Sequence, residues 1–157
     1  AEVCGIAAAA GCQLVASCDL AVASEQASFM TPGVNIGLFC STPMVAVSRN
    51  MSRKKTMEML LTGEKISAIE AVDFGLINHC VSFEKLENKT IDLANLIVSK
   101  PLSTIKIGKE AFYKQAEMPI SEAYNFTSEV MAMNMLEIDA HEGITAFLDK
   151  RTPLWQE

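Results

Sequence analysis

Charged residues are distributed very unevenly along this chain. Residues 1–48 carry only Glu2, Asp19 and Glu25, and all 13 Lys and Arg residues lie at or after Arg49. Because charged side chains are rarely buried unless they are paired, a segment with so few charges is typical of an interior layer within a larger structure. Half of the 157 residues are hydrophobic, which is enough for a packed core. The length fits one domain or part of a larger one, and we expect a truncated chain because no initiator Met opens it.

Charge and hydropathy argue against two classes of partner. The net charge is −6 and the pI is near 5.0, whereas nucleic-acid-binding domains normally show a basic excess or a basic stripe. The longest apolar run, from Cys4 to Cys18, is shorter than the roughly 18 residues that define a membrane helix. No basic segment precedes this run, as one would in a signal peptide. We therefore expect neither nucleic-acid binding nor a membrane span.

The five cysteines form no CxxC pair, and their number is odd. This pattern argues against zinc and thioredoxin-type sites, so we expect no metal site and no permanently bound cofactor. The simplest interpretation is that the cysteines are buried, reduced thiols that act as small apolar residues. Free thiols indicate a reducing compartment, either a mitochondrial matrix or a bacterial cytoplasm.

The apolar pattern changes near residue 52, from mixed strands and helices to mainly helices. In the first part we expect strands at 3–6, 19–24 and 28–30, a helix at 7–17, a turn at Pro32-Gly33, a loop at 37–42 and a helix from Pro43 to about residue 50. In the second part we expect a helix that ends at Gly63, a strand at 77–81, a helix between Ser82 and Pro101, and helices at 102–115, 121–135 and 139–150. We also expect two capping boxes, one from Ser67 to Glu70 and one from Asp139 to Glu142. Prolines 101 and 119 punctuate the helical part, so we divide the chain into residues 1–100 and 101–157.

A run of small residues before the first predicted helix is the candidate binding feature. Small side chains let a ligand approach the backbone, and the first turn of a helix has free N–H groups that face such a ligand. An oxygen that gains negative charge during a reaction is stabilised there, as in an oxyanion hole. The same small residues also permit tight packing of a helix on a sheet, and both interpretations are open. The two histidines, His79 and His141, lack the neighbours of a triad or a metal site, so we interpret them as structural.

Several motifs in the same order and at similar spacing resemble those of the crotonase (enoyl-CoA hydratase/isomerase) superfamily. The chain has VCG at residues 3–5 and AAGCQL at 9–14, where the family has a glycine-rich stretch followed by a glutamate. A Cys18-Asp19 pair and the segment FMTPG at 29–33 follow, and then LLTGEKISAIEAVDFGLINHCV at 60–81. The last motif is EGITAFLDKR at 142–151. The match therefore spans the whole chain.

The resemblance implies an α/β fold of repeated ββα units, with a C-terminal helical region that assembles trimers or hexamers. It implies an acyl-CoA thioester as substrate or ligand, and an enolate stabilised by two backbone N–H groups. One of these N–H groups corresponds to Ala10, and the family supplies the other, with most of the CoA cradle, from a region before the first residue of this chain. Phe147 and Lys150 match positions that approach the CoA nucleotide in relatives.

The two glutamates that hydratases of this family use for proton transfer correspond here to Gln13 and Gly33. An amide does not titrate in a useful range and glycine has no side chain, so ordinary hydration is not expected. Cys40, in the loop that lines the acyl pocket of relatives, is either a replacement nucleophile or proton carrier, or a filler of a small apolar gap. The resemblance therefore predicts a thioester-binding protein of fatty-acid metabolism. The alternative is a regulatory or structural subunit that has kept the fold and lost the reaction.

Overall fold

In the computed structural model, which describes residues 1–156, six strands form two three-stranded sheets, and the first four strands alternate between them. The strands are β1 (Glu2–Val3), β2 (Ile6–Ala8), β3 (Val22–Ser24), β4 (Ser28–Met30), β5 (Ile66–Ser67) and β6 (His79–Val81). The first sheet has the order β1-β3-β6 and is entirely parallel. In the second sheet β4 pairs in parallel with β2 and antiparallel with β5. The first two strand pairs are each followed by helical structure, β1 and β2 by a helix that begins at Ala10 and β3 and β4 by a 3-10 helix that begins at Pro32, so this part of the chain repeats the ββα unit that the family resemblance implies.

Two compact units make up the chain, one from Ala1 to Leu93 and one from Ala94 onward. The first unit contains α1 (Ala10–Ser17), η1 (Pro32–Ile36), α2 (Pro43–Asn50), α3 (Arg53–Thr62), α4 (Ala68–Asp73) and η2 (Phe83–Lys85), where η marks a 3-10 helix. Helix α5 (Leu86–Val98) contains the division between the units. The predicted division into a core part, residues 1–100, and a helical subdomain, residues 101–157, stays a prediction.

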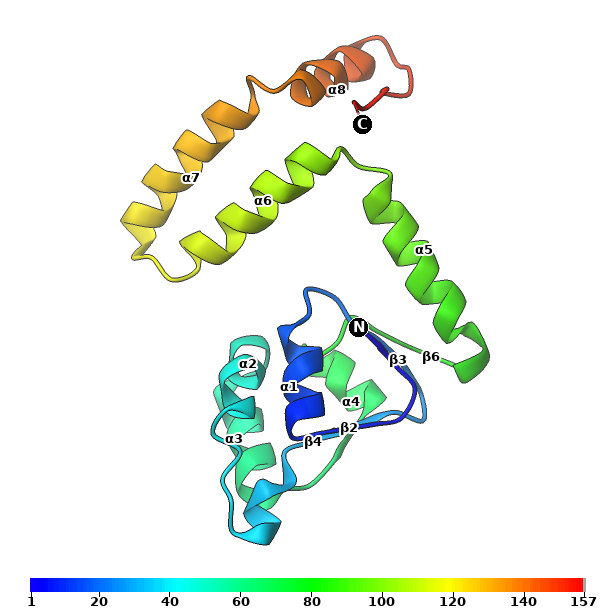
Figure 1. Cartoon of the computed structure of the whole chain (residues 1–157), viewed down its shortest axis with the longest axis vertical. Coiled ribbons are helices and arrows are strands. Elements are labelled where there is room, and N and C mark those ends of the chain that lie inside the picture. The colour runs from blue at the N-terminus through cyan, green and yellow to red at the C-terminus, as the bar shows by residue number, and fades with distance from the viewer. Residues whose placement is uncertain (157) are drawn as a thin grey trace. The chain divides into compact units, whose positions relative to one another are not determined.

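Helices α1, α2 and α3 of the first unit pack in sequence against one another beside the strands (Figure 1). The largest fully buried side chains of this unit come from both sheets and from all three helices: Cys12, Val22, Ser24, Phe29, Thr31, Val47 and Met59. Strand β3 is buried along its whole length, as expected of a central strand in a parallel sheet that is covered on both faces. Burial of Phe29 alone contributes roughly 1.5–3 kcal/mol.

Four predicted boundaries near the N-terminus were wrong. The strand expected at 19–24 begins at Val22. The strand expected at 3–6 is two strands, because the chain bends at Cys4 and Gly5 to move from one sheet to the other. The helix expected at 7–17 begins at Ala10, because Ile6 to Ala8 pair with β4. The expected turn at Pro32-Gly33 is the start of η1.

Several local signals were confirmed. The strand at 28–30 and the helix from Pro43 to Asn50 have the predicted bounds. Gly63 ends α3 in the left-handed conformation, with φ 67°. Ser67 and Glu70 form the predicted capping box, in which each side chain accepts a hydrogen bond from the other residue's backbone N–H.

The second unit is built on an antiparallel pair of helices, α6 (Leu102–Gln115) and α7 (Ile120–Asn134), followed by α8 (Ile138–Leu148). Figure 1 shows α6 and α7 side by side, and α6 also contacts α8. The residues after α8 fold back: the Trp155 indole N–H donates to the Ser99 carbonyl oxygen at 2.9 Å. The Arg151 guanidinium donates two hydrogen bonds to the Glu142 carboxylate, at 2.6 and 3.0 Å.

The capping box predicted at Asp139–Glu142 was wrong. Helix α8 begins one residue before Asp139, and its N-cap is Glu137, without a side-chain hydrogen bond. Asp139 is buried and accepts hydrogen bonds from the Ser103 hydroxyl at 2.8 Å and the Gln156 N–H at 3.0 Å. Both carboxylates of the expected motif therefore hold tertiary contacts of the C-terminal segment in place of a helix cap.

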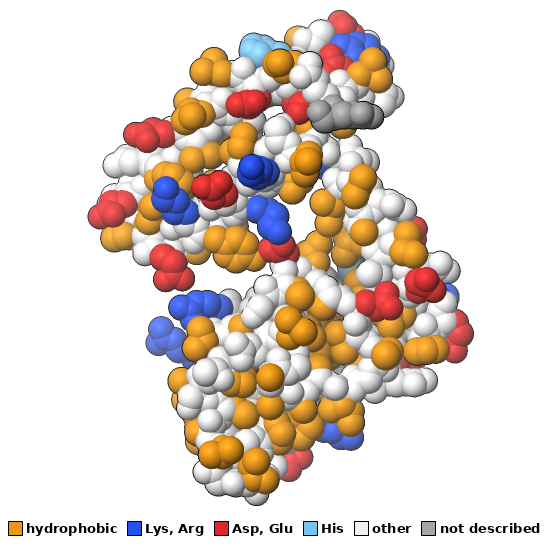
Figure 2. All heavy atoms as spheres, in the orientation of Figure 1, with side chains coloured by type: hydrophobic (Ala, Val, Ile, Leu, Met, Phe, Trp, Pro, Cys, Tyr) orange, Lys and Arg blue, Asp and Glu red, His pale blue; other side chains and the backbone are white. Residues whose placement is uncertain are grey.

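Among residues 1–156, no helix has both the length and the apolar character needed to cross a lipid bilayer. Hydrophobic side chains are nevertheless abundant on the surface of each unit, and Figure 2 shows many of them over the first unit. Within residues 3–30, Ile6 and Leu14 are 71% and 68% exposed.

Candidate functional site

The start of α1 is held in an unusual backbone conformation. Ala9, the N-cap residue, has φ 48° and ψ −112°, and its N–H donates to the Met30 carbonyl oxygen at 2.9 Å. A positive φ costs a residue with a Cβ on the order of 1–2 kcal/mol, so neighbouring structure must impose it. Here the β2–β4 ladder, which pairs Ala8 with Met30, fixes the chain just before the helix.

Ala10 follows as the first helical residue and is exposed. Its N–H is one of the groups at a helix start that have no partner within the helix, and it has none elsewhere among residues 1–156. The predicted donor therefore lies at the surface of the unit, and it is not consumed by packing of the helix on the sheet.

Gln13 lies in the next turn of α1 and is half-buried. Its backbone N–H donates to the Ala9 carbonyl oxygen at 3.0 Å. Its side-chain amide has no hydrogen-bond partner in the described part of the chain, so it is available to a ligand or a water molecule.

The neighbouring Cys12 is fully buried. Burial raises the pKa of the Cys12 thiol to about 11, a backbone hydrogen bond with Met30 lowers it by less, and the nearby Cys40 thiol raises it slightly. Cys12 is therefore a protonated core thiol at neutral pH. The prediction of buried cysteines holds for Cys12 and Cys40, but it was wrong for Cys4, which is exposed, and Cys18 and Cys80 are only half-buried.

Gly33 lies in η1, directly after the end of β4, and Cys40 lies seven residues later. The Gly33 N–H donates to the Cys40 sulfur at 3.3 Å, and the Leu38 N–H donates to the Gly33 carbonyl oxygen at 2.9 Å. The segment turns at Gly37, which is left-handed with φ 78°. Cys40 is buried, whereas Leu38 is exposed.

Four of the six predicted site residues thus belong to one unit. The hydrogen bond between Ala9 and Met30 brings the start of α1 next to the end of β4, from which η1 leads to Gly33. Ala10, Gln13 and Gly33 therefore extend from the same end of the β2–β4 ladder, and Cys40 is joined to Gly33.

The other two predicted residues belong to the second unit. Phe147, near the end of α8, is 81% exposed, as are several other large apolar side chains of this unit at 70% or more. Lys150 is exposed and left-handed, with φ 55°. Its N–H donates to the Phe147 carbonyl oxygen at 3.3 Å, so the two residues lie on one turn.

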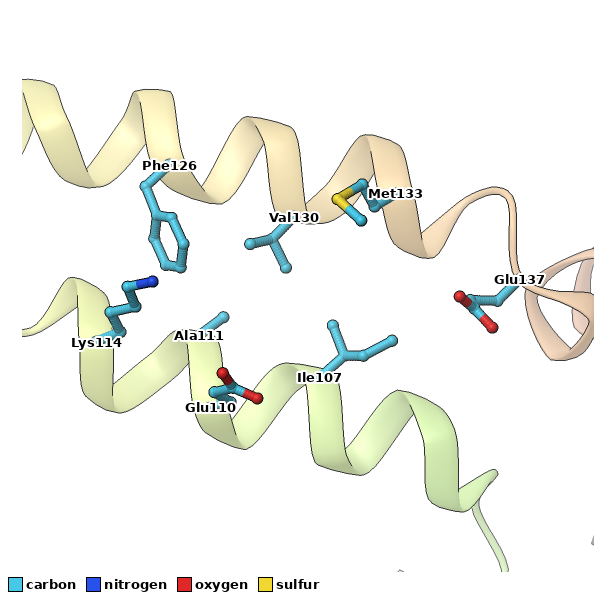
Figure 3. A pocket seen from close by; sticks show the side chains of 8 residues that line it. All are labelled: Ile107, Glu110, Ala111, Lys114, Phe126, Val130, Met133 and Glu137. Carbon is cyan, nitrogen blue, oxygen red and sulfur yellow. The ribbon is translucent and has the colours of Figure 1, made fainter.

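Sequence reasoning missed a pocket of about 200 Å³ between α6 and α7. Figure 3 shows Ile107 and Ala111 of α6 facing Phe126 and Val130 of α7 across it. The Lys114 ammonium lies 4.8 Å from the centre of the Phe126 ring, a cation–π distance. On each helix the apolar residues that line the pocket are four positions apart. The same spacing is typical of ordinary helix packing, so it did not indicate a pocket.

Comparison with known proteins places this geometry in a family. A protein-family model described as enoyl-CoA hydratase/isomerase matches residues 1–157. The human enoyl-CoA hydratase domain-containing protein 3, mitochondrial, is 53% identical over 155 residues, which cover 99% of this chain and 51% of that protein. The chain therefore spans about half the length of the curated relatives that it matches.

Solved structures give the same result. A crystal structure of an enoyl-CoA hydratase from Mycobacterium smegmatis matches with a TM-score of 0.95 and 50% identity, over 97% of this chain and 59% of that one. The crystal structure of the human enoyl-CoA hydratase domain-containing protein 3 matches with a TM-score of 0.93 and 51% identity, over 98% of this chain and 62% of that one. Sequence motifs, the alternating ββα topology and these likenesses agree, and the chain belongs to the enoyl-CoA hydratase/isomerase (crotonase) family.

Proposed function

We propose that this chain is part of an acyl-CoA-binding protein of fatty-acid metabolism, which holds a thioester at the start of α1 without the carboxylate pair of a hydratase. The observation that carries this proposal is the exposed Ala10 N–H, which has no partner among residues 1–156 and follows the strained Ala9. Backbone strain that the surrounding structure imposes is concentrated at functional sites. Membership of the family along the whole chain supports a CoA thioester as the ligand.

In this proposal the thioester carbonyl oxygen accepts a hydrogen bond from the Ala10 N–H. When the α-carbon loses a proton, the carbonyl oxygen gains the negative charge of the enolate. A fixed donor about 2.7–3.1 Å from that oxygen stabilises the charge without having to reorganise. Alanine in place of the family's glycine keeps this donor, because the N–H belongs to the backbone.

Proton transfer is the step for which this site lacks the family's groups. The positions of the two family glutamates are Gln13 and Gly33, and each general acid or base contributes roughly 10²–10⁴-fold. Loss of both leaves hydration of a simple enoyl-CoA near its background rate. The unpartnered Gln13 amide is placed to orient a water molecule or the substrate carbonyl, and Cys40 is the candidate replacement nucleophile or proton carrier.

The remaining family features extend the proposal. Phe147 and Lys150 would contact the CoA nucleotide, which accounts for an exposed phenylalanine beside a cation. The whole protein would assemble as a homotrimer or hexamer. Because relatives that are 53% identical are named as mitochondrial proteins, we place it in the mitochondrial matrix.

The second candidate function is that of a non-catalytic subunit with the same fold. The observation that favours it is the absence of any titratable side chain at positions 13 and 33. Such a subunit would bind acyl-CoA, or a partner enzyme of the same family, without turning the thioester over.

Calorimetry of the full-length protein with acyl-CoAs of several chain lengths tests the shared claim of binding. We expect binding of at least one acyl-CoA, together with near-background hydration of crotonyl-CoA. If no acyl-CoA binds, the proposal is wrong. Robust hydration that a pocket substitution abolishes contradicts the loss of the carboxylate pair.

Product analysis by mass spectrometry separates the enzyme from the subunit. Turnover that falls in Gln13→Ala or Cys40→Ala, with acyl-CoA binding kept, supports an enzyme. Binding without any product supports the subunit. Release of free CoA identifies thioester hydrolysis as the reaction.

A further inference from the structure

The loop after η1 closes back on Gly33. The Gly33 carbonyl oxygen accepts the Leu38 N–H at 2.9 Å, and the Gly33 N–H donates to the Cys40 sulfur at 3.3 Å. Both backbone polar groups of Gly33 are therefore used by the far end of the loop. The left-handed turn at Gly37 allows the chain to reverse between these two contacts.

This closure leaves no room for a side chain at position 33. A Cβ on Gly33 would lie 2.4 Å from the Leu38 carbonyl oxygen and 2.9 Å from the Cys40 sulfur. Cβ atoms essentially never lie closer than 3.0 Å to an atom that is not bonded to them, and a backbone carbonyl cannot rotate away as a side-chain end can. The φ of Gly33 is not in the left-handed range, so the backbone conformation itself would accept a side chain. It is these contacts that exclude a Cβ.

We propose that Gly33 is a positioning residue: its missing side chain lets the Leu38–Cys40 segment close over the place where the carboxylate of a hydratase would begin. This rests on the proposed function, because it is the thioester site that the loop would border. The lack of enoyl-CoA hydration then has two causes: position 33 has no carboxylate, and the backbone of residues 34–40 occupies the space where one would lie. A glutamate introduced at position 33 has to open the loop before it can reach a substrate.

Alkylation of Cys40 tests the loop closure without any acyl-CoA. The full-length protein is treated with iodoacetamide, and labelling of each cysteine is followed by mass spectrometry. In Gly33→Ala we expect Cys40 to react at least about tenfold faster, because a locally opened segment exposes its buried groups. The control is Gly108→Ala, since a Cβ at Gly108 meets no atom within 4 Å, and it should leave the Cys40 rate unchanged.

Cys12, which is fully buried in the same unit, distinguishes opening of the loop from unfolding of the unit. Faster labelling of Cys40 with unchanged Cys12 supports the proposal. An unchanged Cys40 rate overturns it. Equal acceleration of Cys12 and Cys40 also overturns it, because it would show that Gly33 stabilises the whole unit and does not position the loop.

The consequence for the reaction is tested by restoring both carboxylates. We expect the double variant Gln13→Glu/Gly33→Glu, with residues 34–40 otherwise unchanged, to hydrate crotonyl-CoA at no more than the background rate. Efficient hydration by this variant would refute the steric argument. If the wild-type protein binds no acyl-CoA at all, the proposed function fails, whereas the Cys40 labelling still decides the role of Gly33.

Discussion

Two buried threonines beside the candidate site should respond in opposite directions to the same substitution. Thr31 joins β4 to η1 and is 0% exposed, and its hydroxyl donates to the Met59 carbonyl oxygen at 3.0 Å. Thr56 lies on α3 and is 3% exposed, and its hydroxyl has no hydrogen-bond partner among residues 1–156. Valine has nearly the same shape as threonine and replaces the hydroxyl by a methyl group in both cases.

The expected magnitudes follow from these partners. A buried polar group without a hydrogen bond costs about 1–3 kcal/mol, so Thr56→Val should raise the free energy of unfolding by about 1 kcal/mol. Threonine and valine have similar helix propensities, so the helix itself adds little. Thr31→Val loses a hydrogen bond worth about 1 kcal/mol. The Met59 carbonyl oxygen keeps the Gly63 N–H as a partner at 3.1 Å, so we expect a loss of about 1–1.5 kcal/mol.

Urea denaturation and thermal melting, both followed by circular dichroism, measure the changes in free energy and in melting temperature. For a chain of this size, 1 kcal/mol shifts the melting temperature by about 2–4 °C, so the variants should differ by roughly 4–10 °C. The double variant should show the sum of the two effects if the sites act independently. If both substitutions change stability in the same direction, the assignment of a bonded and an unbonded hydroxyl is wrong.

Three further predictions test other features described above. Ala9→Gly should stabilise the protein by about 1 kcal/mol in urea denaturation, because glycine adopts the positive φ without strain; a loss of stability would show that Ala9 is not strained. Gly108→Ala should stabilise its helix by about 1 kcal/mol. Gly143→Ala should stabilise the protein less in the same assay, because its Cβ would lie 3.3 Å from the Trp155 ring. Equal gains in stability would mean that the ring does not pack there. The hydrogen bonds that the Glu142 carboxylate accepts lower its pKa from 4.5 to about 2, so their contribution is present above pH 4.5 and is lost as the pH falls towards 2. Denaturation of Glu142→Gln should therefore show a weaker fall in stability between pH 4.5 and 2, and an unchanged pH profile would contradict this.

Features that depend on a few neighbouring residues were predictable from the sequence. Gly63 ends α3 because glycine adopts the left-handed conformation there, and Ser67 with Glu70 form a cap within one turn of helix. The family motifs also named Ala10, Gln13 and Gly33 as candidate site residues. The structure extends all three from one end of a strand ladder, and their role in a site stays a prediction.

Features that depend on distant residues were not predictable in the same way. The start of α1 moved from residue 7 to Ala10 because residues 28–30 form a strand beside 6–8, which no property of the alanines indicates. Asp139 and Glu142 have the spacing of a capping box, but residues of the C-terminal segment are their partners. The closure of the loop on Gly33 likewise depends on how the backbone of residues 34–40 runs, which the residue types alone do not indicate.

Strand β3 depends on both ends of its unit, and this has a consequence for synthesis of the chain. One edge of β3 is covered by β1, about twenty residues earlier, and the other by β6, which pairs His79 with Val22. Until residues 79–81 have been translated, the second edge of β3 presents unpaired N–H and C=O groups within an apolar segment. Such an edge is a template for other strands, so nascent or prematurely terminated chains that end before residue 79 should depend on chaperones and aggregate without them.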